Sequence, residues 1–123
     1  MTVVDSSGWV EFLTGGPLAE RFLPTIERMG EVVTPTVVLY EVFKRILRER
    51  GEDEAQEKVA YMRKTRVVPL TDGLAVSAAR LALEHRLAMA DAMIYATALA
   101  EGAEVLTLDH DFEGLPHATV VKA

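Results

Sequence analysis

Short runs of β-branched and apolar residues alternate with longer segments of helical periodicity, and this alternation constrains the fold more than any other feature of the chain. The runs suited to strands cover residues 2–4, 32–33, 66–70, 104–108 and 119–121. Strands separated by helices pair in parallel, because each crossover returns the chain to the same end of the sheet. The pattern predicts an α/β fold, a three-layer α/β/α sandwich around a central parallel sheet of four to five strands.

Capping and breaking residues mark the helices between these runs. Ser6 or Ser7 is expected to cap the first helix, and Thr34 with Pro35 to start the third, which Gly51 ends. The expected helices cover residues 9–13, 17–29, 34–50, 52–64, 74–86 and 89–101.

The residue types that the chain lacks exclude several kinds of metal site and catalytic mechanism. The 123 residues suit one domain, expected over residues 1–123, and contain no cysteine, which excludes disulfides, thiolate zinc sites and cysteine nucleophiles. His85, His110 and His117 lack metal-ligand spacing, so oxygen atoms would hold any metal, which favours Mg²⁺ or Mn²⁺. With no secretory pattern and no apolar run near 18 residues, a cytoplasmic location is expected.

Basic residues are concentrated in one part of the chain. The net charge of −6 argues against a nucleic-acid partner, because Lys and Arg supply the affinity for phosphate. Residues 44–66, however, hold eight of the 13 basic residues and only five acids. This segment is either a solvated helical surface or a phosphate-binding one.

Five acidic residues occur where a solvated surface does not explain them. They are Asp5, Glu41, Asp91, Asp109 and Asp111. Asp5 ends the first strand, where α/β proteins build their sites, although it could instead cap the next helix. Glu41 lies in a helical turn so apolar that burial is expected, and Lys44 or Arg45 could supply an intrahelical partner.

The later acids also leave two interpretations open. Asp91 is the sole charge between Arg86 and Glu101, so it is either a site residue or a carboxylate favoured by a helix N-terminus. Asp109 and Asp111 share one face if the chain stays extended after the strand, or else they belong to an Asp-rich turn. Two carboxylates ~5 Å apart repel by about 3 kcal/mol at an effective dielectric constant near 20. Convergence of several therefore favours a divalent cation.

The order of these acids resembles that of PIN-domain nucleases of the VapC type, the toxins of type II toxin–antitoxin pairs. The motifs that carry the resemblance are Val-Val-Asp5-Ser-Ser, Thr34-Pro-x-Val-x-x-x-Glu41-Val, Ala90-Asp91-Ala-x-Ile-Tyr-Ala-x-Ala and Thr107-x-Asp109-x-Asp111-Phe. Together they span nearly the whole chain.

The resemblance implies metal-dependent hydrolysis of RNA phosphodiester bonds without a protein nucleophile. It implies a catalytic, metal-holding set of Asp5, Glu41, Asp91 and Asp109, with Asp111 as a further metal ligand. Ser6 and Thr107 match hydroxyl residues that border the family's site, although capping and turn formation would also explain them. A homodimer and a cognate antitoxin partner are also implied.

Lys44, Arg45 and Arg48 follow Glu41 at helical spacing, and we expect them to contact RNA phosphates. Two alternatives to a ribonuclease stay open. One is a PIN-like module that binds RNA or protein without catalysis, and the other is a Mg²⁺-dependent phosphohydrolase acting on DNA.

Overall fold

Five parallel strands form one sheet in the order β3-β2-β1-β4-β5 in the computed structural model, which describes residues 1–123. The strands are β1 (Thr2–Val4), β2 (Val32–Pro35), β3 (Arg66–Val68), β4 (Glu104–Thr107) and β5 (Ala118–Val120). The strand order reverses on either side of β1, so β1 and β4 flank a topological switch point. The predicted parallel α/β sheet is confirmed, with five strands.

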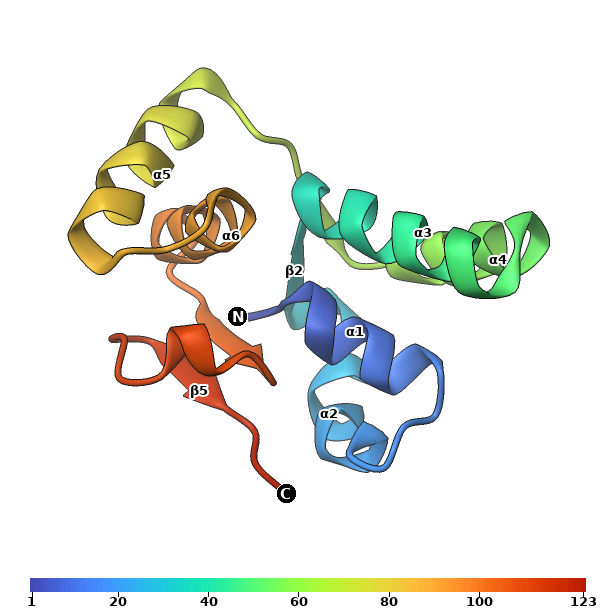
Figure 1. Ribbon diagram of the computed structural model, residues 1–123. Coiled ribbons are helices and arrows are strands. Elements are labelled where there is room, and N and C mark those ends of the chain that lie inside the picture. Colours follow the sequence, from blue (N-terminus) through green and yellow to red (C-terminus); the bar gives the residue numbers. More distant parts are fainter.

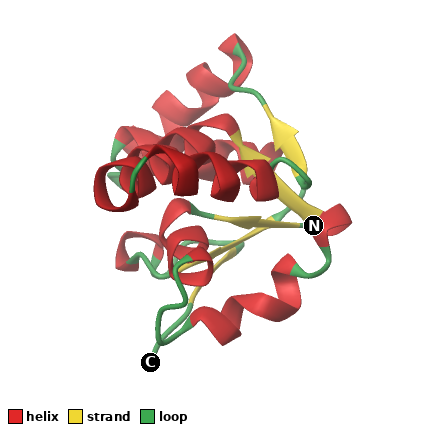
Figure 2. Cartoon of the chain, turned by 90° about the vertical axis from the view of Figure 1, so that its right-hand side faces the viewer, coloured by secondary structure: helices red, strands yellow, loops and turns green.

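Six α-helices lie on both sides of the strands (Figure 2), which confirms the predicted sandwich. They are α1 (Ser6–Leu13), α2 (Ala19–Ile26), α3 (Thr36–Arg50), α4 (Glu52–Met62), α5 (Asp72–His85) and α6 (Met89–Ala100). Figure 1 shows α5 and α6 together on one side and α1 and α2 on the other, while α3 and α4 form a projecting hairpin. Two short 3-10 helices, η1 (Met29–Glu31) and η2 (His110–Phe112), complete the structure.

Two expected helix starts are wrong, one because of a local hydrogen bond and one because of strand pairing. Asp5, with extended backbone, caps α1 by accepting a hydrogen bond from the Gly8 N–H at 3.0 Å, whereas Ser6 and Ser7 already lie within the first turn. Thr34 belongs to β2, paired with β3, so α3 begins only at Thr36. The second helix is shorter than expected, since α2 ends at Ile26, two residues after Pro24.

The core fills both sides of the central strands. Val3, Val4, Val33 and Val105 are fully buried, and Trp9 is the largest of the buried side chains that cover them. No helix is both long and apolar enough to span a bilayer.

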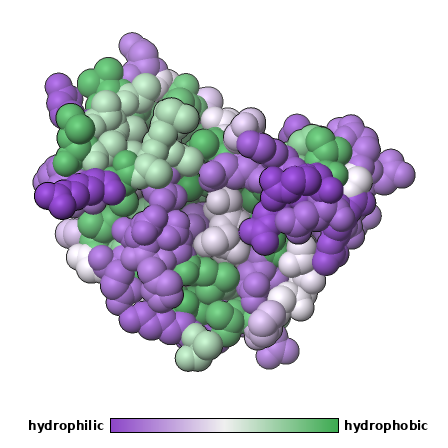
Figure 3. Space-filling view, in the orientation of Figure 1, coloured by the Kyte–Doolittle hydropathy of each residue, from purple (hydrophilic) through white to green (hydrophobic).

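Hydrophilic and apolar side chains gather on different parts of the surface (Figure 3). Hydrophilic side chains cover much of the α3–α4 hairpin, while apolar ones gather over α5. Leu83 of α5 is 87% exposed, and Met89, at the start of α6, is 73% exposed. Large exposed apolar groups of this kind are typical of surfaces that bind another protein.

Gly8 allows α1 to approach β1 and α2 closely. A Cβ atom at this position would lie 2.6 Å from Cε1 of Phe22 and 2.9 Å from Cγ1 of Val4. Both neighbours are fully buried, so neither side chain has space to move.

We therefore expect Gly8→Ala to lower the free energy of unfolding by about 1–3 kcal/mol through overpacking, measured by urea denaturation. Gly30→Ala is the matched control, because its added Cβ meets nothing within 4 Å. Equal urea midpoints for the two variants would contradict this account of the α1 packing.

Candidate metal centre

The candidate site lies at the carboxyl ends of β1 and β4, on either side of the switch point. Asp5 directly follows β1, and Asp109 comes two residues after β4. The register pairs Val4 with Leu106, and the Asp5 N–H donates to the Leu106 carbonyl at 3.3 Å. The pairing of these two strands therefore brings residues about 100 positions apart to the same edge.

Asp5 is 2% exposed and held by four hydrogen bonds. Its Oδ1 accepts from the Gly8 N–H at 3.0 Å and the Ser7 hydroxyl at 2.8 Å. Its Oδ2 accepts from the Thr107 hydroxyl at 2.6 Å and from Ser7 at 3.0 Å. Burial raises the pKa of this carboxyl, and the hydrogen bonds oppose the rise. The capping interpretation of Asp5 is confirmed, and its charge also contributes to the raised pKa of Asp91.

Thr107 and Ser7 connect Asp5 to the segment that carries Asp109. The Thr107 hydroxyl accepts from the Asp109 N–H at 2.8 Å while it donates to Asp5. The Ser7 hydroxyl accepts from the Leu108 N–H at 3.1 Å. From the sequence, Ser7 is predicted only as a helix cap. The one sequence signal for its contact with Asp5 is that it places a hydroxyl two residues after an aspartate at the end of a strand.

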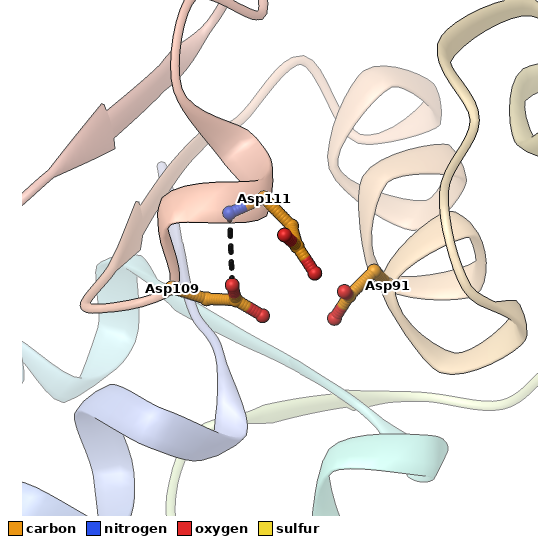
Figure 4. A group of neighbouring side chains, drawn as sticks. All are labelled: Asp91, Asp109 and Asp111. Carbon is orange, nitrogen blue, oxygen red and sulfur yellow. Dashed lines mark hydrogen bonds between the residues drawn. The ribbon is translucent and has the colours of Figure 1, made fainter.

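Asp91, Asp109 and Asp111 form a group in which one oxygen from each carboxylate lies within 4.8 Å of the others. Figure 4 shows Asp91 projecting from α6 toward the two aspartates at η2. The Asp111 N–H donates to Oδ1 of Asp109 at 2.9 Å, so an Asp turn brings the pair together. Of the two interpretations left open by the sequence, the structure has the Asp-rich turn, because residues 110–112 form η2. The two side chains nevertheless converge.

Asp91 has the most perturbed titration of the group. Burial raises its pKa to about 7, with further contributions from the charges of Asp109, Asp5, Glu41 and Asp111. The residue does lie in the first turn of α6, where the helix dipole favours a negative charge. Burial and the neighbouring carboxylates act in the opposite direction and favour the protonated form.

Glu41 faces the same region from α3 and is half-buried. Its Oε1 accepts a hydrogen bond from the Ser6 hydroxyl at 2.9 Å. Neither Lys44 nor Arg45 pairs with it, because Lys44 contacts Tyr40 and Arg45 pairs with Glu49 at 3.1 Å. The intrahelical ion pair considered for Glu41 is therefore not formed.

A groove of 280 Å³ extends from Glu41 along the basic side of α3. Its walls include Ser6, Ser7, Val10, Tyr40, Glu41, Lys44, Arg45 and Arg48. Arg45 and Arg48 share Glu49 as their only carboxylate partner, and Lys44 has none. The basic residues expected to contact phosphate thus lie in one groove with two site residues, Glu41 and Ser6.

The donor chemistry fits a hard divalent cation. The group of three carboxylates contains oxygen donors alone, and no histidine nitrogen joins it. None of the five predicted acids forms an ion pair with Lys, Arg or His. Their mutual repulsion, visible in the raised pKa of Asp91, is what a bound cation would relieve.

The chain belongs to the PIN-domain family, because the family model described as PIN domain matches residues 2–118. No curated protein matches the sequence. Among solved structures, a toxin–antitoxin complex from Klebsiella pneumoniae is similar in fold, with a TM-score of 0.84 and 19% identity over 98% of this chain and 97% of that chain.

Two further structures share the fold. One is VapC20 of Mycobacterium tuberculosis, a sarcin–ricin loop cleaving toxin, with a TM-score of 0.81 and 22% identity over 100% of both chains. The other is VapBC2 of Rickettsia felis bound to a promoter DNA fragment, with a TM-score of 0.75 and 14% identity over 98% of this chain and 96% of that chain.

The raised pKa of Asp91 predicts how stability depends on pH when no metal is bound. Its pKa rises from 3.8 to about 7, so the folded protein retains a proton that the unfolded chain releases. The stabilisation from this proton is complete below about pH 4 and is lost as pH rises to about 7.

We expect Asp91→Asn to raise the Tm above that of the wild type in EDTA at about pH 8, and the two to converge near pH 4, in scanning calorimetry. Asp53→Asn, an exposed change on α4, is the control and should follow the wild type at both pH values. A wild-type Tm equal to or higher than that of Asp91→Asn at pH 8 would show that the folded state tolerates this charge.

Proposed function

We propose that this chain is a metal-dependent endoribonuclease, formed by a single nuclease domain over residues 1–123, that acts as the toxin of a toxin–antitoxin pair. The observation that supports it best is the convergence of Asp91, Asp109 and Asp111 within 4.8 Å, beside the buried Asp5, with no basic partner. Domains without a metal or catalytic site rarely gather unpaired carboxylates in this way, because burying a charge without a partner is energetically costly.

Asp5, Glu41, Asp91, Asp109 and Asp111 would hold Mg²⁺ or Mn²⁺. Divalent ions in such sites supply Lewis-acid activation of water for phosphodiester hydrolysis. The acids Asp5, Glu41, Asp91 and Asp109 are the proposed catalytic set, and Asp111 adds a further oxygen ligand.

The chain's own hydroxyls support the acids and do not act as nucleophiles. Ser7 and Thr107 donate to Asp5, and Ser6 donates to Glu41, so each hydroxyl proton is engaged with a carboxylate. None of the three hydrogen-bonds to a histidine that could accept its proton. Water is therefore the proposed nucleophile, with 5′-phosphate and 3′-hydroxyl ends as the expected products.

The structural neighbours support the toxin role and a protein partner. The Klebsiella pneumoniae structure is a toxin–antitoxin complex, and VapC20 is a toxin that cleaves the sarcin–ricin loop. By analogy we assign this chain a cognate antitoxin and a cytoplasmic RNA substrate. The exposed apolar side chains at Leu83 and Met89 favour a homodimer, which would cover them.

The nuclease proposal predicts that purified protein cuts RNA only with Mg²⁺ or Mn²⁺. Asp5→Asn and Asp91→Asn should each reduce cleavage by roughly 100-fold or more, because each removes a charged oxygen ligand while keeping the side-chain shape. Gel assays of cleavage, with circular dichroism to verify the fold, measure both effects.

Asp53→Asn, far from the site on α4, is the control and should cleave like the wild type. Activity that survives EDTA, or that both site variants retain, would overturn the metal-dependent mechanism. DNA tested beside RNA separates the two phosphodiester substrates. RNA binding without metal-dependent cleavage would indicate the non-catalytic module.

The groove beside Glu41 predicts a salt-dependent contribution to RNA binding. Replacing Lys44, Arg45 or Arg48 by Ala should weaken binding and reduce the slope of log K against log salt by about 0.7 for each phosphate that the side chain neutralises. Fluorescence anisotropy with single-stranded RNA measures the slope, using the Asp91→Asn background to prevent cleavage.

Arg80→Ala is the matched control, since Arg80 is an exposed cation on α5 outside the groove. If its slope changed as much as that of Lys44→Ala, the groove would have no special role in phosphate binding.

A further inference from the structure

Tyr40 is the one aromatic side chain of the chain that is mostly exposed. It is 62% exposed, whereas Trp9, Phe22, Tyr95 and Phe112 are buried. Exposing an aromatic ring forgoes the large stabilisation that its burial provides, so the folded core does not account for this residue. Tyr40 directly precedes Glu41 on α3, and the two residues line the same groove.

Tyr40 lies between a polar, charged groove and a more apolar hollow between α3 and α4. The ring shares the 280 Å³ groove with Glu41 and Ser6. The Lys44 ammonium lies 5.5 Å from the ring centroid and 3.5 Å from the phenolic oxygen. A flat exposed ring, an ammonium without a carboxylate partner and the Glu41 carboxylate therefore occur together within one groove.

We propose that Tyr40 is a stacking platform for one unpaired nucleobase of the RNA, adjacent to the phosphate that is cleaved. This inference rests on the proposed nuclease function and assigns it a base-binding subsite. Every nucleobase presents a π-face, so an aromatic platform binds bases with little dependence on sequence. Lys44 next to the ring is placed to contact a neighbouring phosphate of the same strand.

The charge pattern of the groove favours a nucleotide over a peptide segment as the occupant. Lys44 has no carboxylate partner, and Arg45 and Arg48 have one between them, so this side of the groove carries excess positive charge. Phosphates bound here would lie in the same groove as Glu41. A base that stacks on Tyr40 must be unpaired, so single strands and loops are the expected substrates.

The test pairs protein variants with a substrate whose register is known. The probe is a short single-stranded RNA in which cleavage by the wild type has been mapped. Each nucleotide near the cut is replaced in turn by an abasic ribose. Binding is measured in the Asp91→Asn background, with Tyr40 intact or changed to Leu or Trp. Leu keeps apolar bulk without a π-face, and Trp keeps the face.

We expect Tyr40→Leu to bind the intact RNA roughly 5- to 100-fold more weakly, and Tyr40→Trp to bind like the wild-type side chain. When the abasic ribose stands at one particular position, and only there, the protein with Tyr40 and Tyr40→Leu should bind the RNA with equal affinity. Such a coupling at a single nucleotide would not follow from a general loss of stability.

Three results would overturn the subsite. Equal RNA binding by the protein with Tyr40 and by Tyr40→Leu would show that the aromatic ring does not contribute to RNA binding. The same ratio of RNA affinities between the two proteins at every abasic position would also contradict stacking. Weaker RNA binding by Tyr40→Trp than by the protein with Tyr40 would contradict it as well. Absence of any RNA cleavage by the wild type would instead refute the proposed nuclease, so the two failures are distinguishable.

Discussion

The pairing of β1 with β4 is the constraint on which the rest of the site depends. Because Val4 pairs with Leu106, the chain leaves both strands at the same edge, and Asp5 meets the Thr107 hydroxyl at 2.6 Å. That hydroxyl in turn receives the Asp109 N–H. A shift of one residue in this register would turn Thr107 to the other face and separate Asp5 from the segment carrying Asp109.

These hydrogen bonds stabilise the backbone around the acids, but the negative charges of the acids still repel one another. Asp5 receives four hydrogen bonds, yet burial still raises its pKa, and the pKa of Asp91 is raised to about 7. Burial of the valines in the central strands stabilises the fold, and this stabilisation offsets the repulsion between the acids. A site that is unfavourable without its ligand and held by a rigid sheet is a common compromise between stability and function.

Local sequence signals were enough to predict the architecture and to single out Asp91, Asp109 and Asp111, which the structure brings together, but not the long-range hydrogen bonds around the acids. β-branched runs and helix breakers depend on near neighbours, so the strand and helix order follows from them. The hydrogen bond between Ser6 and Glu41 spans 35 residues, and that between Thr107 and Asp5 spans 102. These partners are determined by tertiary packing, which local patterns in the sequence do not report.

Helix α3 accounts for how an acidic protein could bind the polyanionic substrate proposed for it. Glu41 projects toward the carboxylates, while Lys44, Arg45 and Arg48, three, four and seven residues further along, line the adjoining groove. At these spacings all four side chains lie along one side of the helix, so a single element supplies both signs of charge in sequence. Since the Debye length at physiological salt is about 8 Å, a bound strand responds to these local charges far more than to the net charge of −6.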